Sequence, residues 1–307
     1  MEKGSCSTVS EFILLGLSDP PELSVFLSLV FLLIYGVTVM GNLGMITVTQ
    51  ASSQLHTPMY FFLCHLSLVD FCYSTIILPK LLANILVKEK AFSFQGCMVQ
   101  FYLFCTYVVT GVILLAVMAY DHFLAIYYPL LYMVIMSRKL CVGLVLVCGT
   151  VHSLIHMCLA LEIPTYSSNV VNHFCDLPPL LSLACSDVSV NELVVYIVTT
   201  LNEIITIMII LTSYLFIPIT ILRMRSAERR CKAFFTCASH FMATIVFHGT
   251  IIFFYCRPSS DYSLETEKVT TVFYTVVVPM LNPLIYYSLR NKDVKAAFRK
   301  MVGFKMF

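Results

Sequence analysis

Long apolar stretches alternate with short polar ones along the whole chain. Each stretch reaches the roughly 20 residues that a helix needs to cross the hydrocarbon core of a bilayer. Buried helices of a soluble protein would be shorter and would carry polar faces. The pattern therefore predicts an all-α membrane protein, a seven-helix bundle with spans at about Leu23–Thr49, Pro58–Leu82, Met98–Tyr128, Lys139–Leu161, Leu193–Leu222, Ala233–Cys256 and Val269–Ser288.

The third predicted span ends in a chemically distinctive segment. Almost no charge occurs from Met98 to Tyr120, and Asp121, His122 and Pro129 then follow. An ionisable pair at this point lies at a membrane–water boundary, where a charge is tolerated. Cys97 marks the opposite end, so the span has one end on each side of the bilayer.

Composition supports the membrane class. Of 307 residues, 59% are hydrophobic and only 12% are charged, and the mean hydropathy is +0.88. A soluble protein of this length needs more charge to cover its surface. The formal net charge of +2 makes nucleic acid an unsuitable partner, whereas the lipid bilayer is an expected one.

The positions of lysine and arginine predict the orientation. Most of the 19 basic residues follow the first, third, fifth and seventh spans, and basic residues mark the cytosolic side. We therefore expect an extracellular N-terminus at residues 1–22, a seven-span transmembrane domain at 23–290 and a cytoplasmic tail at 291–307. The tail alternates charged and apolar residues, which predicts a short amphipathic helix on the membrane surface.

Most of the 13 cysteines fall inside apolar stretches, where a thiol behaves as a small hydrophobic group. Cys97, at the outer end of the third span, faces the long loop of about Glu162–Glu192, which carries Cys175 and Cys185. A disulfide between them would hold this loop over the bundle as a lid. Cys175 is the first choice of partner and Cys185 the second, and the loop sequence alone does not decide.

Several short motifs follow one another along the chain: Glu11–Leu17, Leu55–Leu63, Met118–Asp121 with Pro129–Tyr132, His173–Asp176, Ala184–Asp187, Lys232–His240 and Pro279–Pro283. In this order, they resemble the motifs of olfactory receptors. The resemblance implies a rhodopsin-like G-protein-coupled receptor in the plasma membrane. It implies that the receptor binds a small volatile odorant and activates the stimulatory olfactory G protein and adenylyl cyclase.

Two departures from the family pattern fall at functional positions. The arginine that follows the aspartate in the family is His122 here, and histidine is shorter and mostly neutral near pH 7. Coupling to the G protein is therefore expected to be weakened. A loop cysteine of the family is replaced near Tyr166, which leaves Cys185 without its usual partner.

The resemblance assigns two groups of residues inside the bundle. Asp70 in the second span, with Asn42 and Asn282, is expected to hold water or a sodium ion; the alternative is a hydrogen bond between helices alone. Activation and coupling are assigned to Asp121, His122, Tyr214, Asn282, Pro283 and Tyr286.

A ligand cavity is expected in the outer half of the third, fifth, sixth and seventh spans. Phe101, Phe104, Cys105 and Val108 recur at spacings of three and four, so they share one face of the third span. Mostly apolar walls suit a poorly water-soluble ligand. Glu203 either contacts the ligand, which would favour amines as well as neutral odorants, or faces a neighbouring helix. The candidate residues are Phe101, Phe104, Cys105, Val108, Thr199, Asn202, Glu203, His248, Ile251, Ile252 and Tyr255.

Other functions have weaker support. A solute transporter or channel, the alternative, would need a polar pathway, and embedded charge is nearly confined to Asp70 and Glu203. Enzyme motifs and zinc-type cysteine or histidine spacings are missing from the sequence. His152 and His156 have the spacing of a metal pair but no accompanying carboxylate, so packing is the preferred interpretation. We expect no enzyme activity, metal or cofactor beyond the possible sodium ion.

Overall fold

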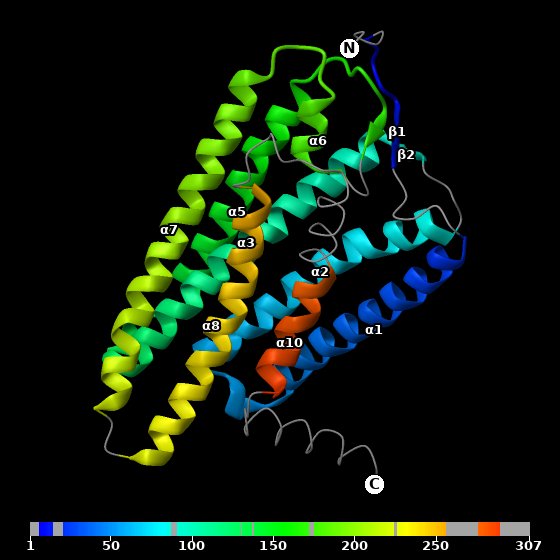
Figure 1. The fold of residues 1–307 in the computed structure, drawn as a ribbon. Coiled ribbons are helices and arrows are strands. Elements are labelled where there is room, and N and C mark those ends of the chain that lie inside the picture. Colours follow the sequence, from blue (N-terminus) through cyan, green and yellow to red (C-terminus); the bar gives the residue numbers. More distant parts are fainter. Residues whose placement is uncertain are drawn as a thin grey trace.

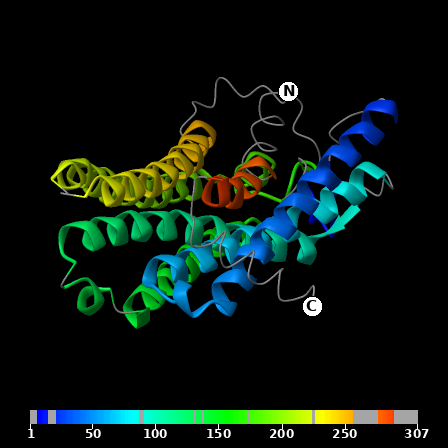
Figure 2. The same ribbon diagram turned by 90° about the horizontal axis from the view of Figure 1, so that it is seen from below.

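The central element is the helix α3, Phe94–Tyr127, which packs against α2, Pro58–Leu86, α5, Arg138–Leu161, α7, Ser189–Leu222, and α8, Ala227–Tyr255. The structure is a computed structural model that describes residues 6–14, 21–86, 91–129, 131–136, 138–171, 175–223, 226–255 and 276–288. Two further helices, α1, Pro21–Ala51, and α10, Val278–Ser288, pack against each other, and α1 also packs along α2. Figure 2 shows α8 and α10 in one tier and α3 in the other.

Five helices among the described residues are long and apolar enough to span a membrane: Ser24–Ala51, Pro58–Leu86, Phe94–Tyr127, Ser189–Leu222 and Ala233–Phe253. The fourth predicted span corresponds to α5, within which Gly149–Leu161 is an apolar helical segment shorter than a full span. The seventh begins outside the described residues and ends in α10. The molecule is therefore a helical membrane bundle. The predicted tail helix at 291–307 lies outside the described residues.

Several helices extend beyond the predicted spans, because a helix can continue into water once it leaves the hydrocarbon. The 34 residues of α3 and of α7 exceed the span length, and α7 begins at polar residues such as Ser189 and Asn191. The α3 N-terminus is capped by Ser93, whose hydroxyl accepts a hydrogen bond from the Gly96 N–H at 3.2 Å.

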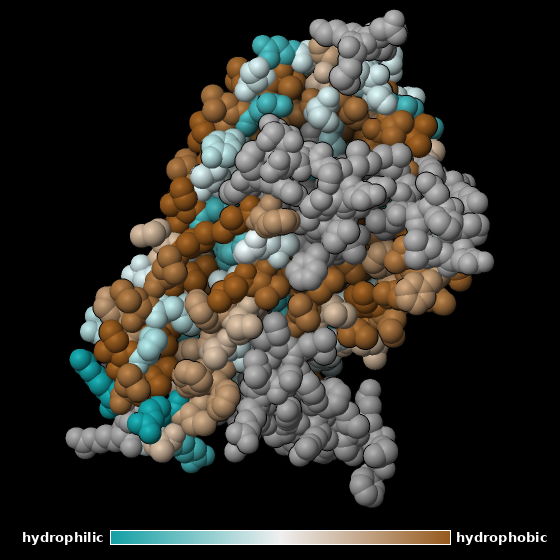
Figure 3. Space-filling model, viewed as in Figure 1, coloured by the Kyte–Doolittle hydropathy of each residue, from teal (hydrophilic) through white to brown (hydrophobic). Residues whose placement is uncertain are grey.

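The outer surface of the bundle is apolar where lipid is expected. Figure 3 shows hydrophobic side chains over the flank formed by α7, with polar residues gathered near its ends. Exposed large hydrophobic residues recur along α1, α7 and α8, including Leu33, Met40, Leu215 and Met242. Water would not tolerate so continuous a surface, whereas lipid tails do.

A small sheet covers one end of the bundle (Figure 1), and the sequence analysis did not predict it. Its strands are β1, Glu11–Leu14, β2, Ala91–Ser93, and β3, Val170–Val171, in the order β2-β1-β3. The β1 strand pairs antiparallel with β2 and parallel with β3. We call this end of the molecule the sheet end. The side chains of β1 alternate, so Phe12 and Leu14 are buried while Glu11 and Ile13 are exposed.

Two disulfides fasten the segments at the sheet end. Cys97, in the first turn of α3, is bonded to Cys175, just before the short helix α6, Leu177–Ser182. Cys185 is bonded to Cys6 instead of standing without a partner or competing for Cys97. The sequence analysis missed this pairing because the residues are 179 positions apart, and no local pattern indicates such a contact.

Candidate ligand and signalling sites

A cavity of about 520 Å³, counting the space open toward solvent, lies between α3, α5, α7 and α8 on the side nearer the sheet end. Its wall is mainly aromatic and aliphatic, with a few polar side chains, which is typical of small-molecule sites. The lining residues are Phe101, Phe104, Cys105, Val108, Val109, Val112, His152, His156, Asp176, Leu177, Val195, Thr199, Asn202, Glu203 and Ile251.

Most of the predicted ligand residues line this cavity, and two of the described ones, Ile252 and His248, do not. Ile252 follows Ile251 by 100° around the α8 helix and is 39% exposed, so its side chain faces outward. The buried His248 lies behind Glu203 instead of on the wall. The side chain of Tyr255 lies outside the description.

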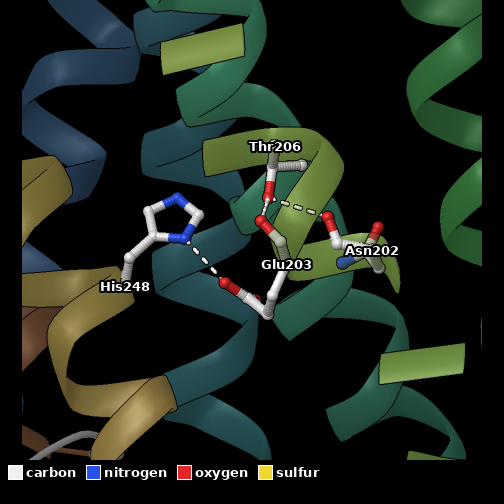
Figure 4. A network of polar contacts seen from close by, with 4 residues as sticks. All are labelled: Asn202, Glu203, Thr206 and His248. Carbon is white, nitrogen blue, oxygen red and sulfur yellow. Dashed lines mark hydrogen bonds and ion pairs between the residues drawn. The ribbon is translucent and has the colours of Figure 1, made fainter. Parts of the chain in front are cut away.

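Glu203 and His248 form a buried polar pair between α7 and α8 (Figure 4). The distance from His248 Nδ1 to Glu203 Oε2 is 2.9 Å, and the Nε2 of His248 is buried without a hydrogen-bond partner. The other carboxylate oxygen, Oε1, has no hydrogen bond to a residue that the structure describes. One turn further along α7, the Thr206 hydroxyl donates to the backbone carbonyls of Asn202 and Glu203. Glu203 therefore contacts a neighbouring helix and also lines the cavity.

The two histidines of α5 also reach the cavity. The rings of His152 and His156 stack with their centroids 4.5 Å apart. Within the described part of the chain, no group of three or more histidine, cysteine, aspartate or glutamate side chains could hold a metal ion. The pair packs as two aromatic rings on the wall of the cavity.

A second cavity, of about 360 Å³, borders Asp70 and shares the walls Val108 and Ile251 with the first. The Asn282 side-chain amide donates to Asp70 Oδ2 at 2.9 Å, which links α2 and α10. The buried hydroxyl of Tyr73, also on this wall, has no hydrogen-bond partner.

The sequence analysis grouped Asn42 with Asp70 at a water or sodium site, and the structure shows which groups the Asn42 amide contacts. This amide donates to the carbonyls of Thr38 at 3.0 Å and of Pro279 at 3.3 Å. Pro283 lies four residues after Pro279 and has no N–H, so the Pro279 carbonyl lacks its helical donor. Asn42 supplies the missing donor from α1, as neighbouring helices do for membrane helices with proline.

The end of the bundle opposite the sheet contains a cluster of three aromatic side chains from three helices. His122 on α3 and His240 on α8 are buried, with ring centroids 5.0 Å apart. His240 Nδ1 is 2.6 Å from the hydroxyl of Tyr214 on α7, and that hydroxyl also donates to the Cys237 carbonyl at 3.2 Å. Neither ring nitrogen of His122 has a hydrogen-bond partner. We call His122, Tyr214 and His240 the histidine cluster.

The neighbouring Asp121 has a different partner. Its Oδ1 accepts a hydrogen bond of 2.7 Å from the hydroxyl of Tyr132, in the short helix α4, Tyr132–Ile135. Tyr132 and His240 were part of motifs in the sequence, but their roles required the fold. The side chain of Tyr286, also predicted to act in coupling, lies outside the description, whereas Asn282 and Pro283 are buried in α10.

The described residues thus define a helical membrane bundle with a mostly apolar cavity between its helices. A sequence profile described as olfactory receptor matches residues 31–305. The chain is 68% identical to human olfactory receptor 5L1 and 68% identical to human olfactory receptor 5L2, in each case over 100% of this chain and 99% of the relative. It is 57% identical to human olfactory receptor 5D18, over 96% of both chains.

The chain therefore belongs to the olfactory receptor family. Its function is that of an odorant receptor in a membrane, and it is not an enzyme. The resemblance predicted from the sequence motifs is confirmed.

Proposed function

We propose that this receptor binds a small volatile odorant in the cavity between α3, α5, α7 and α8, and that binding activates a stimulatory olfactory G protein. The observation that carries the proposal is the mostly apolar cavity between the helices, because three of the helices that bound it also meet in the histidine cluster. A ligand that contacts α3, α7 and α8 can favour one arrangement of these helices over another. The histidine cluster responds to the same arrangement.

The orientation of the proposed receptor follows the basic residues. The chain spans the plasma membrane seven times, with the sheet end outside and the Asp121 end inside. The disulfides Cys97–Cys175 and Cys6–Cys185 suit an oxidising exterior. The G protein then binds at Asp121, His122 and Tyr214, after the inner end of α8 moves away from α3.

The second cavity has a supporting role. Asp70, Asn282 and the unpaired Tyr73 hydroxyl offer oxygen and amide groups that suit water molecules or a sodium ion. Because this cavity shares Val108 and Ile251 with the ligand cavity, a change in either alters the wall of the other.

An odorant panel read by cAMP in transfected cells tests the function. At least one neutral odorant should raise cAMP, and substitution of Phe104 by tryptophan, which fills the cavity, should abolish the response at equal surface expression. Transport of the odorant across the membrane without cAMP would favour the transporter alternative and contradict the proposal.

A further inference from the structure

The Glu203–His248 pair has an incomplete set of hydrogen bonds, and this pattern indicates which ring nitrogen of His248 carries the proton. His248 is buried, its Nδ1 contacts Glu203 Oε2, and its Nε2 has no partner. A protonated histidine, or a histidine whose Nδ1 accepts a hydrogen bond from a neutral glutamic acid, would leave a buried Nε2–H donor unsatisfied. A neutral histidine with its proton on Nδ1 leaves only an unsatisfied acceptor, which native proteins tolerate more often.

In that state His248 donates to Glu203 Oε2, so the contact is compatible with a Glu203 carboxylate that pairs with a cation in the cavity. His248 holds Oε2 from the side away from the wall, which leaves Oε1 available to a ligand. Asp176, the other acid of the wall, already accepts a hydrogen bond from the Leu177 N–H. Among the described lining residues, no lysine or arginine is present to neutralise the charge.

An ionised carboxylate in a low-dielectric cavity is costly unless a cation pairs with it. A cationic side chain of the protein would have to be part of the cavity wall, whereas a ligand can carry its own positive charge. The rest of the wall, including Phe101, Phe104 and Val112, fits a compact apolar body. The cavity therefore offers one anionic contact and an otherwise hydrophobic surface.

We propose that the ligands of this receptor include small hydrophobic primary amines, whose ammonium group donates hydrogen bonds to Glu203 Oε1. His248 is a positioning residue, because it orients the carboxylate without lining the cavity. This assignment rests on the proposed ligand cavity and specifies the chemical class that it takes. A charge-assisted hydrogen bond is stronger than a neutral one, so the amine should bind better than an alcohol of the same shape.

Thermal unfolding of the purified receptor in lipid nanodiscs tests the proposal with three probes of one shape: cyclohexylmethylamine, cyclohexylmethanol and cyclohexanecarboxylic acid. Ligand that binds only the folded state raises the unfolding temperature. The amine should bind about 30-fold more tightly than the alcohol, and the acid should not bind. Equal binding of amine and alcohol would overturn the assignment.

Matched variants localise the effect. Glu203→Gln removes the charge and should bring amine and alcohol to equal affinity, whereas Glu203→Asp should keep part of the preference. Glu228→Gln makes the same chemical change at an exposed site in the first turn of α8 and should change nothing. If Glu203→Gln does not fold, loss of the preference in His248→Gln, with alcohol binding retained, is the expected result. An unchanged preference in every variant would overturn the role of Glu203.

The cAMP assay separates this inference from the proposed function. Activation by cyclohexylmethanol with no binding of the amine would leave the odorant-activated signalling intact and overturn the amine class. A shift in unfolding temperature that depends on the amine, with no cAMP response to any ligand, would support the amine site and contradict the proposed signalling.

Discussion

Single side chains at the Asp121 end determine how the inner ends of three helices meet. His122, where the sequence analysis expected an arginine from the family pattern, is held in an apolar setting. Its ring is buried against His240 without a hydrogen bond, while the hydrogen bond of Asp121 is made with Tyr132. A neutral ring can be buried in this way, but a guanidinium group cannot without paired acceptors.

His122→Arg should raise both basal and odorant-stimulated cAMP at equal surface expression. The rise should be about tenfold if the arginine destabilises the packing of α3 against α8 by about 1.4 kcal/mol. The permanent charge cannot remain against His240, so α3 and α8 separate more readily. His122→Gln is the control, since it is neutral and of similar reach, and its signalling should stay near that of the unmodified receptor. An equal gain in both variants would mean that lost packing, and not charge, limits coupling.

At the scale of elements, α3 and α5 approach closely because α5 carries a glycine where they cross. A Cβ at Gly149 would lie 2.6 Å from Thr110 Oγ1 on α3. The threonine cannot simply rotate away, because its hydroxyl donates to the Thr106 carbonyl. Small residues at such contacts are the usual means by which membrane helices pack tightly.

Gly149→Ala should lower the free energy of unfolding by about 1–3 kcal/mol, because the new methyl group forces α3 and α5 apart. Gly143→Ala on the same helix is the matched control. A Cβ there has no atom within 4 Å, so the variant should be neutral or should stabilise the helix by up to about 1 kcal/mol. Thermal unfolding in nanodiscs measures both, and equal behaviour would contradict the role of the glycine in packing.

The sheet end depends on elements that are distant in sequence. The N-terminal strand β1 lies between β2 and β3, and the Cys6–Cys185 disulfide fastens the segment before β1 to the loop before α7. Phe12 of β1 packs edge-on against Tyr166, with ring centroids 5.4 Å apart. Tyr166 is thus part of the core that holds β1.

Cys6→Ser and Cys185→Ser should each destabilise the receptor by about 2–4 kcal/mol, because either change releases the same cross-link. The double variant should be no less stable than the worse single one. Cys158→Ser, at an exposed free cysteine, is the control. A much larger effect of Cys185→Ser than of Cys6→Ser would show that Cys185 has another partner.

At the scale of the whole molecule, the apolar flanks and the two disulfides at one end lead to a single topology. Helix α3 contacts four other long helices, so a ligand in the cavity acts on the centre of the bundle. The exposed hydrophobic residues of α1 and α7 suit surrounding lipid, and the two disulfides at the sheet end suit an oxidising environment.

An epitope tag at the N-terminus should be accessible on intact cells, and a C-terminal tag only after permeabilisation. The expected result follows from the basic residues after the odd-numbered spans. Detection of both tags on intact cells would contradict the seven-span topology and with it the proposed site of G-protein binding.

How much of the structure could be predicted from the sequence depends on how far apart in the chain the interacting residues lie. The face of α3 that carries Phe101, Phe104, Cys105 and Val108 was predicted because helical periodicity is local, and these residues do line the cavity. Ile252 was predicted to line the cavity but faces outward, because the sequence of α8 does not show which face of the helix points into the bundle. The partner of Asn42 was missed because the free carbonyl of Pro279 comes from another helix.

The sequence by itself determined the membrane class, the family and the approximate positions of the spans, since hydropathy and motifs are properties of short segments. Only the tertiary structure decided that Cys6 bonds to Cys185, that His122 lies against His240 and that His248 orients Glu203. The residues of these three pairs are 179, 118 and 45 positions apart in the sequence. The first pair is joined by a disulfide, the second by ring packing and the third by a hydrogen bond. The apolar pattern of each helix is compatible with many neighbours, and packing of the assembled helices selects among them.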